Sequence, residues 1–275
     1  MKTIARIFCF ALFGSSLLSL LHAAETSFPN AEKAPSRLYF GGEITHLDIS
    51  TNSVYKKITG KNYFKGLRLG YDIIKPNSPY FGFHALLMRS KATFQFNSNH
   101  ALGDYFESRT YTKRSFFANP EFRIGQTFAG QEALSTLFLG MGSYFFTFPY
   151  GNYRWEKSVT HLELLGYLTG GALISYAFSP SLHVGCHLKA FWVFYSRETL
   201  SSDLGENSYY NGCLSQETRS HTDKSWGYQF GIPLTWQSIK LPSFDTQFEP
   251  YYLKINTKRG VISSYGVRLT FGSRF

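Results

Sequence analysis

Histidines close together in the sequence are the first residues of this 275-residue chain that could bind a metal ion. His183 and His187 occur in the stretch HVGCH, and on a helix their two imidazoles would be neighbours. On a strand, residues four positions apart are separated by about 13 Å, which is too far for one ion with bonds of about 2 Å. The flanking residues alternate as they do in a strand. We therefore expect two separate histidines and no metal site.

Catalysis would need an acid or base beside a nucleophile or an activated water. The candidates occur in polar stretches and are His46, Asp48, His100, Asp104, His221 and Asp223. None of them belongs to a motif that we can match, and exposed loop residues explain them better. Gly140 and Gly142 lack the third glycine and the helix of a dinucleotide site. We expect no enzyme, no catalytic residue and no cofactor.

Strands are the elements that must position these residues. Aromatic residues make up 18% of the chain, with 27 Phe and 19 Tyr beside 24 Gly, and this mixture favours strands and tight turns. Alternating runs predict ten strands, near 37–46, 63–74, 80–95, 113–128, 134–148, 160–178, 181–196, 224–237, 244–256 and 261–275. Residues 134–148 are apolar on both faces, so their inward face stays open. Pro120, Pro233 and Pro250 fall inside predicted strands, where each removes a ladder hydrogen bond.

Short and long connections between these strands alternate. The short ones are 75–79, 129–133, 179–180 and 238–243, and the long, polar ones are 47–62, 96–112, 149–159 and 197–223. The last connection, TKRG at 257–260, is a short exception. One end of the molecule therefore carries tight turns and the other carries loops, as in bacterial outer-membrane barrels.

The stretch WGYQFGIPLTW indicates the length of one strand. Trp226 and Trp236 stand at the two ends of its apolar face. Ten intervals of about 3.3 Å, tilted by roughly 40°, project to about 25 Å, the height of the apolar band of a membrane barrel. Because amphipathic rings favour the two edges of such a band, we expect an aromatic girdle that contains Trp226, Trp236 and Trp192. A soluble β-protein with the same alternation would leave these rings without a contact.

The N-terminal residues 1–24 have the pattern of a secretory signal peptide, with a basic region, an apolar stretch and small residues. Removal of Lys2 and Arg6 with this segment changes the formal net charge from +10 to 10 − 2 = +8. A basic exported chain could meet anionic lipid headgroups, polyanions or acidic solutes, and we expect no nucleic-acid partner. Three cysteines exclude a disulfide scaffold, and we expect no bridge between Cys186 and Cys213.

The C-terminal stretch YGVRLTFGSRF places one set of apolar side chains on one face of a last strand. This set is Tyr265, Val267, Leu269, Phe271 and Phe275. The stretch resembles the C-terminal signal of Gram-negative outer-membrane β-barrel proteins, which the barrel-assembly machinery recognises. The resemblance implies an assembly signal, a cell outer-membrane location, and the lipid bilayer and lipopolysaccharide as partners.

The fold that we expect is all-β, a single antiparallel transmembrane β-barrel of about ten strands, with eight or twelve as alternatives. It has short periplasmic turns and longer extracellular loops. The domains are a signal peptide at 1–24, a short periplasmic N-terminal segment at 25–36 and the barrel at 37–275.

Counting residues upward from the periplasmic strand ends predicts a charged cluster in the lumen. Glu43, Arg68, Arg268 and Glu249 lie at similar heights on inward faces. Because closure puts the first strand between the second and the last, we expect Glu43 between Arg68 and Arg268, with Glu249 beyond Arg268. Isolated charges there would be costly, whereas paired ones are tolerable. The alternative is that shear displaces these residues and each meets only water.

Three functions remain open from the sequence. The first is a narrow pore for small solutes or a structural barrel, since eight strands just enclose their side chains and ten leave only a narrow lumen. The second is a surface adhesin or receptor that binds an extracellular ligand through its long loops, above all 197–223. The third is a hydrolase at the rim of an outer-membrane barrel, either a protease or a lipid hydrolase.

Overall fold

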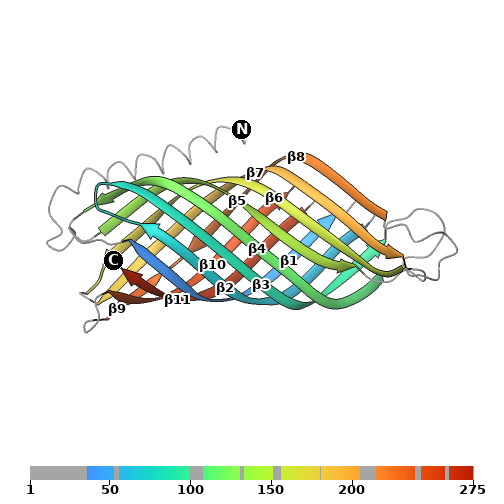
Figure 1. The fold of residues 1–275 in the computed structure, drawn as a ribbon, viewed down its shortest axis with the longest axis horizontal. Helices are drawn as coiled ribbons and strands as arrows, with labels where there is room; N and C mark the ends of the chain where they lie inside the picture. Colours follow the sequence, from blue (N-terminus) through green and yellow to red (C-terminus); the bar gives the residue numbers. More distant parts are fainter. Residues whose placement is uncertain are drawn as a thin grey trace, which may run out of the picture.

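A computed structural model shows the chain as a closed antiparallel β-barrel (Figure 1). It describes residues 36–52, 56–98, 108–130, 133–150, 156–179, 181–204, 215–238, 243–257 and 260–274. The predicted signal peptide, all of the 25–36 segment but its last residue, and Phe275 lie outside these residues. Among the described residues, no helix is long and apolar enough to cross a membrane.

The strands follow one another along the chain and around the wall. They are β1 Arg37–Asn52, β2 Lys56–Ile73, β3 Pro79–Ser98, β4 Ser108–Ala129, β5 Ala133–Tyr150, β6 Glu156–Ala177, β7 Leu182–Leu204, β8 Ser215–Gly231, β9 Leu234–Gln237, β10 Phe244–Thr257 and β11 Gly260–Arg274. β8 and β9 are two parts of one wall strand, because both pair with β7 and with β10. β1 pairs with β11 and closes the barrel, so the wall has ten strands, as predicted.

The two ends of the barrel differ in their connections. Arg37 lies opposite Arg274, so the first and last strands meet at the same end. Residues 74–78, 130–132, 178–181 and 238–243 connect strands at this end. We call it the turn end, and the opposite end the loop end.

Proline explains why one wall strand is divided. Pro233 separates β8 from β9, and Pro250 of β10 lies beside this break in the ladder. Two hydrogen bonds span the break: Gly185 N donates to the Pro233 carbonyl at 2.7 Å, and Ile232 N donates to the Pro250 carbonyl at 3.0 Å. Proline offers a carbonyl but no N–H, so each proline here accepts a bond without having to donate one. Pro120 remains inside β4.

The strands continue beyond their predicted boundaries at the loop end. Most residues of the four predicted long loops belong to strands, and 53–55, 99–107, 151–155 and 205–214 lie outside the described residues. The predicted boundaries are wrong here because polarity marks where a strand leaves apolar surroundings, whereas backbone pairing continues while two strands stay side by side.

The longest strand shows how far the wall extends. β7 has 23 residues. At about 3.3 Å per residue and a tilt of roughly 40° it rises about 55 Å, twice the roughly 25 Å of an apolar membrane band. On its outer face the wall carries a band of exposed apolar side chains, which we call the apolar belt. The wall therefore continues past this belt at the loop end. We call this extension the collar, and it comprises 47–52, 56–62, 88–98, 108–115, 146–150, 156–161, 195–204, 215–225, 253–257 and 260–264.

The two faces of the wall have opposite character. Outward apolar side chains are strongly exposed, as in Leu67 at 71% and Leu139 at 69%. Inward side chains include charged groups that are almost fully buried, as in Glu43 and Arg123, each at 2%. This inversion of the soluble pattern is the one that a barrel in lipid requires.

The apolar belt predicts how the cost of an outward charged residue depends on its depth in the membrane. Leu69 is 57% exposed near the middle of the belt, whereas Thr93 is outward in the collar. We expect Leu69→Arg to lower the free energy of unfolding by about 2–4 kcal/mol, because the guanidinium would enter hydrocarbon. Thr93→Arg should cost less than about 1 kcal/mol. Urea titration of both variants in lipid vesicles measures the difference, and equal costs would contradict the assignment of the belt.

Candidate functional site

The four predicted lumen charges meet inside the barrel. Arg268 Nε lies 3.0 Å from Glu43 Oε2, and Arg268 Nη1 lies 3.1 Å from Glu249 Oε1. Arg68 Nη1 lies 3.3 Å from Glu43 Oε2. The structure thus brings the four together in the order expected from closure, with Glu43 between the two arginines. What this cluster does for the protein stays a prediction.

Two further side chains complete the cluster. The Tyr251 hydroxyl donates to Glu43 Oε1 at 2.5 Å, and the Arg268 guanidinium lies 3.8 Å from the centre of the Tyr251 ring. His187 Nδ1 lies 3.1 Å from Glu249 Oε1. The Glu43 carboxylate therefore has three donors although it is almost fully buried, and this compensates the loss of water.

A second cluster, which the sequence analysis missed, surrounds Glu121. Its carboxylate accepts from Arg123 Nε at 2.5 Å, from Lys189 Nζ at 2.6 Å and from the Tyr167 hydroxyl at 2.5 Å. The sequence could have predicted this cluster. Glu121 and Arg123 are two residues apart in β4 and therefore face the same side, and Lys189 falls at an inward position of β7. Pro120, in the middle of the predicted strand, obscured it.

A third group lies around Asp72. Its carboxylate accepts a hydrogen bond from the Tyr80 hydroxyl at 2.7 Å and lies 3.2 Å from His84 Nε2. The other ring nitrogen of His84 contacts the Tyr39 hydroxyl. Aspartate, histidine and two tyrosines from β1, β2 and β3 thus form one buried chain of polar contacts.

Charged side chains also join the strands at the turn end. Arg37 Nη2 lies 2.6 Å from Asp245 Oδ1, and Arg274 Nε lies 2.7 Å from Asp245 Oδ2. Arg37 Nη1 donates to Gln247 Oε1 at 2.6 Å. A cavity of about 170 Å³ lies among these groups, and its lining includes Arg37, Arg68, Arg123, Arg274, Asp72 and Glu249.

Charges of the two signs balance among the inward side chains, of which Glu163 lies opposite Phe146 of β5. Among the inward side chains that the structure describes, the cations are Arg37, Arg68, Arg123, Lys189, Arg268 and Arg274, and the carboxylates are Glu43, Asp72, Glu121, Glu163, Asp245 and Glu249. A balanced and hydrogen-bonded set of charges rigidifies an interior. No group of three or more His, Cys, Asp or Glu in the described part of the chain is placed to hold a metal ion.

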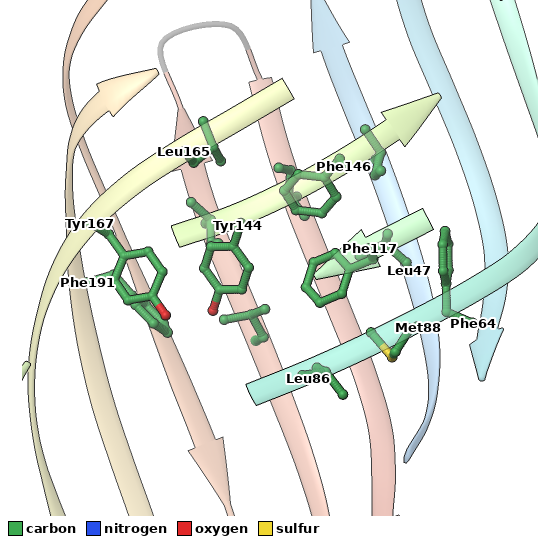
Figure 2. Close-up of a cluster of buried hydrophobic side chains, with 14 of the residues drawn as sticks. Leu47, Phe64, Leu86, Met88, Phe117, Tyr144, Phe146, Leu165, Tyr167 and Phe191 are labelled. Atoms are coloured by element: carbon green, nitrogen blue, oxygen red, sulfur yellow. The ribbon is translucent and has the colours of Figure 1, made fainter. Parts of the chain in front are cut away.

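An apolar plug fills the lumen on the loop-end side of these charges (Figure 2). The ring centres of Phe117 and Phe146 are 4.8 Å apart, as are those of Tyr144 and Tyr167. Phe146 is 1% exposed and Leu165 is 0% exposed, so the layer is tightly filled. The plug consists of Leu47, Ile49, Phe64, Leu86, Met88, Phe117, Tyr144, Phe146, Leu165, Tyr167, Phe191, Val193, Tyr251, Leu253, Ile255 and Ile262.

The plug explains the segment whose inward face the sequence left open. Tyr144 and Phe146 are buried in the lumen, whereas Leu139 and Met141 of the same strand are 69% and 59% exposed on the outside. Residues 134–148 are apolar on both faces because both faces meet apolar surroundings.

The candidate acids and bases do not form a catalytic pair among the described residues. His46 faces outward, between the rings of Tyr63 at 5.0 Å and Tyr265 at 4.7 Å. Asp48 lies 3.9 Å from Lys61 on the outer wall. The other candidates are outside the part described at side-chain level: His100, Asp104, His221 and Asp223.

The histidines and cysteines of β7 are placed separately. His187 is buried beside Glu249, and His183 lies four residues nearer the turn end. Cys186 is a free thiol, and Cys213 lies outside the described residues.

The predicted girdle and assembly residues lie on the outer wall. Trp192 and Trp226 are paired across β7 and β8 and are 50% and 51% exposed, and Trp236 of β9 is 45% exposed at the turn end. The outward residues of β11 are Tyr265, Val267, Leu269 and Phe271. Contact with membrane interfaces and recognition during assembly stay predictions, and Phe275 is not described.

The central ion pairs predict a large cost for one substitution. Glu43→Ala should lower the free energy of unfolding by about 3–5 kcal/mol, because it leaves Arg68 and Arg268 buried without their shared carboxylate. The matched control on the same strand is Asp48→Ala, which removes an exposed ion pair and should cost less than about 1 kcal/mol. Denaturant titration in vesicles compares them. A Glu43→Ala variant as stable as Asp48→Ala would contradict the importance of the cluster.

Comparison with known proteins supports the fold. No protein-family model and no curated protein matches the sequence. Among solved structures, the outer membrane protease OmpT from Escherichia coli matches with a TM-score of 0.63 and 9% identity, over 91% of this chain and 99% of that chain. Ail of Yersinia pestis, in complex with the heparin analogue sucrose octasulfate, matches with a TM-score of 0.39 and 10% identity, over 88% and 99%. The Pseudomonas putida toluene transporter TodX matches with a TM-score of 0.41 and 8% identity, over 92% of this chain and 95% of that chain. Because the last two TM-scores are below 0.5, neither of these two matches adds to the assignment of the fold. The chain has the fold of an outer-membrane β-barrel protein.

Proposed function

We propose that this protein is an outer-membrane barrel whose interior is sealed, and that it acts at the cell surface through its collar rather than as a channel. The observation that carries the proposal is the apolar plug on the loop-end side of a network of paired charges. The sequence left open a narrow pore or a structural barrel, and this filling of the lumen supports the structural barrel.

The sealing follows from how the lumen is filled. A ten-stranded barrel leaves little space beyond its own side chains. In the plug, Tyr167 and Val193 are each 0% exposed, so no water-filled path passes beside them. An ion would have to cross an apolar layer, which is a barrier to hydrated ions, and then displace paired charges.

The outer-membrane location rests on the outward belt, on the predicted signal peptide and on the resemblance of the last strand to an assembly signal. Lipopolysaccharide and the barrel-assembly machinery are the partners that this location implies. In this orientation the turn end faces the periplasm and the collar stands outside the cell.

A second candidate function is supported by the collar. The wall rises well past the apolar belt, so the paired strand ends of the collar extend beyond the membrane surface. An adhesin or receptor would use this to present a surface to an extracellular ligand. Residues 197–223 contribute to it with the ends of β7 and β8. The likeness to a protease, at 9% identity, supports the fold and not a rim hydrolase.

Conductance in planar bilayers tests the sealed interior. We expect the refolded wild-type protein to insert without current steps. Phe117→Gly combined with Tyr144→Gly and Phe146→Gly removes three rings of the plug and should produce current steps. Current steps from the wild type would contradict the proposal.

A matched variant controls for loosening of the wall. Leu139→Gly combined with Met141→Gly removes two outward side chains from the same strand, β5. It should remain without current steps, because the plug is intact. Steps from this control as large as those from the plug variant would show that the wall, and not the plug, blocks ions.

A further inference from the structure

A basic patch lies on the outer wall of β2, β3 and β4. It consists of Lys65, Arg89, Lys91 and Arg114, all exposed. Lys65 lies directly opposite Arg89, and Lys91 lies directly opposite Arg114. Opposite Cβ atoms are about 5 Å apart, and residues two positions along one strand are about 7 Å apart. The four cationic side chains therefore start from Cβ atoms that lie close together on the wall.

The neighbouring outward residues do not compensate this charge. Outward positions of 59–73 in β2, 79–93 in β3 and 114–128 in β4 hold no aspartate or glutamate. On β1, the outward carboxylate of Asp48 lies 3.9 Å from Lys61, which is not a member of the patch. Since like charges directly opposite each other destabilise a sheet, the bare patch lowers the stability of the wall. An anionic ligand would remove this cost.

Exposed apolar side chains border the patch on its turn-end side. Leu67 and Leu87 form the next outward pair below Lys65 and Arg89, and they are 71% and 53% exposed. Phe116 lies opposite Arg89 and is 43% exposed. The cations thus stand where the apolar belt ends at the loop end, which is the level of lipid headgroups in a membrane.

We propose that the basic patch binds the phosphate groups of lipopolysaccharide, with the acyl chains of this lipid on Leu67, Leu87 and Phe116. Arginine and lysine donate several hydrogen bonds to phosphate oxygens, and each cation near an anionic membrane surface adds to the affinity. A soluble polyanion would neutralise the cations but leave the apolar border uncovered, so the lipid fits better. This inference rests on the proposed function, because it requires the loop end of the belt to face the outer leaflet.

The test compares lipids that differ only in phosphate. The refolded full chain in detergent is titrated with lipid A that carries two phosphates and with the same lipid A after removal of both. We expect the wild type to bind the phosphorylated form more than about tenfold tighter. The patch variant Lys65→Gln/Arg89→Gln/Lys91→Gln/Arg114→Gln should lose this preference.

A control variant separates the patch from total charge. Lys75→Gln/Arg197→Gln/Lys224→Gln/Lys254→Gln removes the same number of cations from the turn after β2 and from β7, β8 and β10. It should bind phosphorylated lipid A as the wild type does. Circular dichroism and resistance to protease check that each variant is folded.

Three results would overturn the inference. They are equal affinities of wild type and patch variant for phosphorylated lipid A, an equal loss of affinity in the control variant, and stronger binding of heparin than of lipid A by the wild type. None of these results bears on the proposal of a sealed interior, which the conductance measurements test separately. Current steps from the wild type would contradict the proposal of a sealed barrel and would not change the result of the lipid measurements.

Discussion

Closure of the wall is the constraint on which the rest of this structure depends. When β1 pairs with β11, every wall strand has a partner on both sides and the sheet has no edge. Every second residue is then enclosed in the lumen, and the residues between them face outward. A backbone without free edges can stand in lipid, because its polar groups are paired within the wall. Which side chains meet lipid and which meet one another follows from this alternation.

The enclosed space is filled in two ways. Toward the turn end, carboxylates and cations are paired, and glycine leaves room for large side chains: a Cβ at Gly70 would lie 2.1 Å from the Tyr39 ring. Toward the loop end, aromatic and aliphatic side chains pack together, with the buried carboxylate of Glu163 opposite Phe146. The charged layer tolerates no unpaired member, whereas the apolar layer excludes water. Together they fill most of the lumen that the ten strands enclose.

The outer wall is uneven along its axis. Apolar side chains occupy the belt, and cations follow at its loop-end border on β2, β3 and β4, with the apolar residues Ile73, Phe81 and Ile124 at the turn end of the same strands. A membrane with different lipids in its two leaflets would fit such a wall in one direction. The proposed function at the collar and the proposed lipid site both depend on this difference between the two ends of the wall.

Much of this fold can be predicted from local sequence. Alternation predicts the ten wall strands, and turn residues predict the turn end. Parity together with the assumption of closure predicts that Glu43 lies near Arg68 and Arg268. These properties depend on residue type and on the period of a strand, which the chain carries locally.

Other features depend on contacts between distant segments. The strand ends at the loop end are set by backbone pairing that continues through polar residues, as in β7 up to Leu204. The inward face of 134–148 is decided by the lumen, because both parities are apolar. Glu121 meets Lys189, 68 positions away, only through the register of the strands between them. Likewise, four cations that seem scattered in the sequence become one patch only when β2, β3 and β4 align. Register and shear belong to the closed sheet as a whole, so the tertiary structure alone decides them.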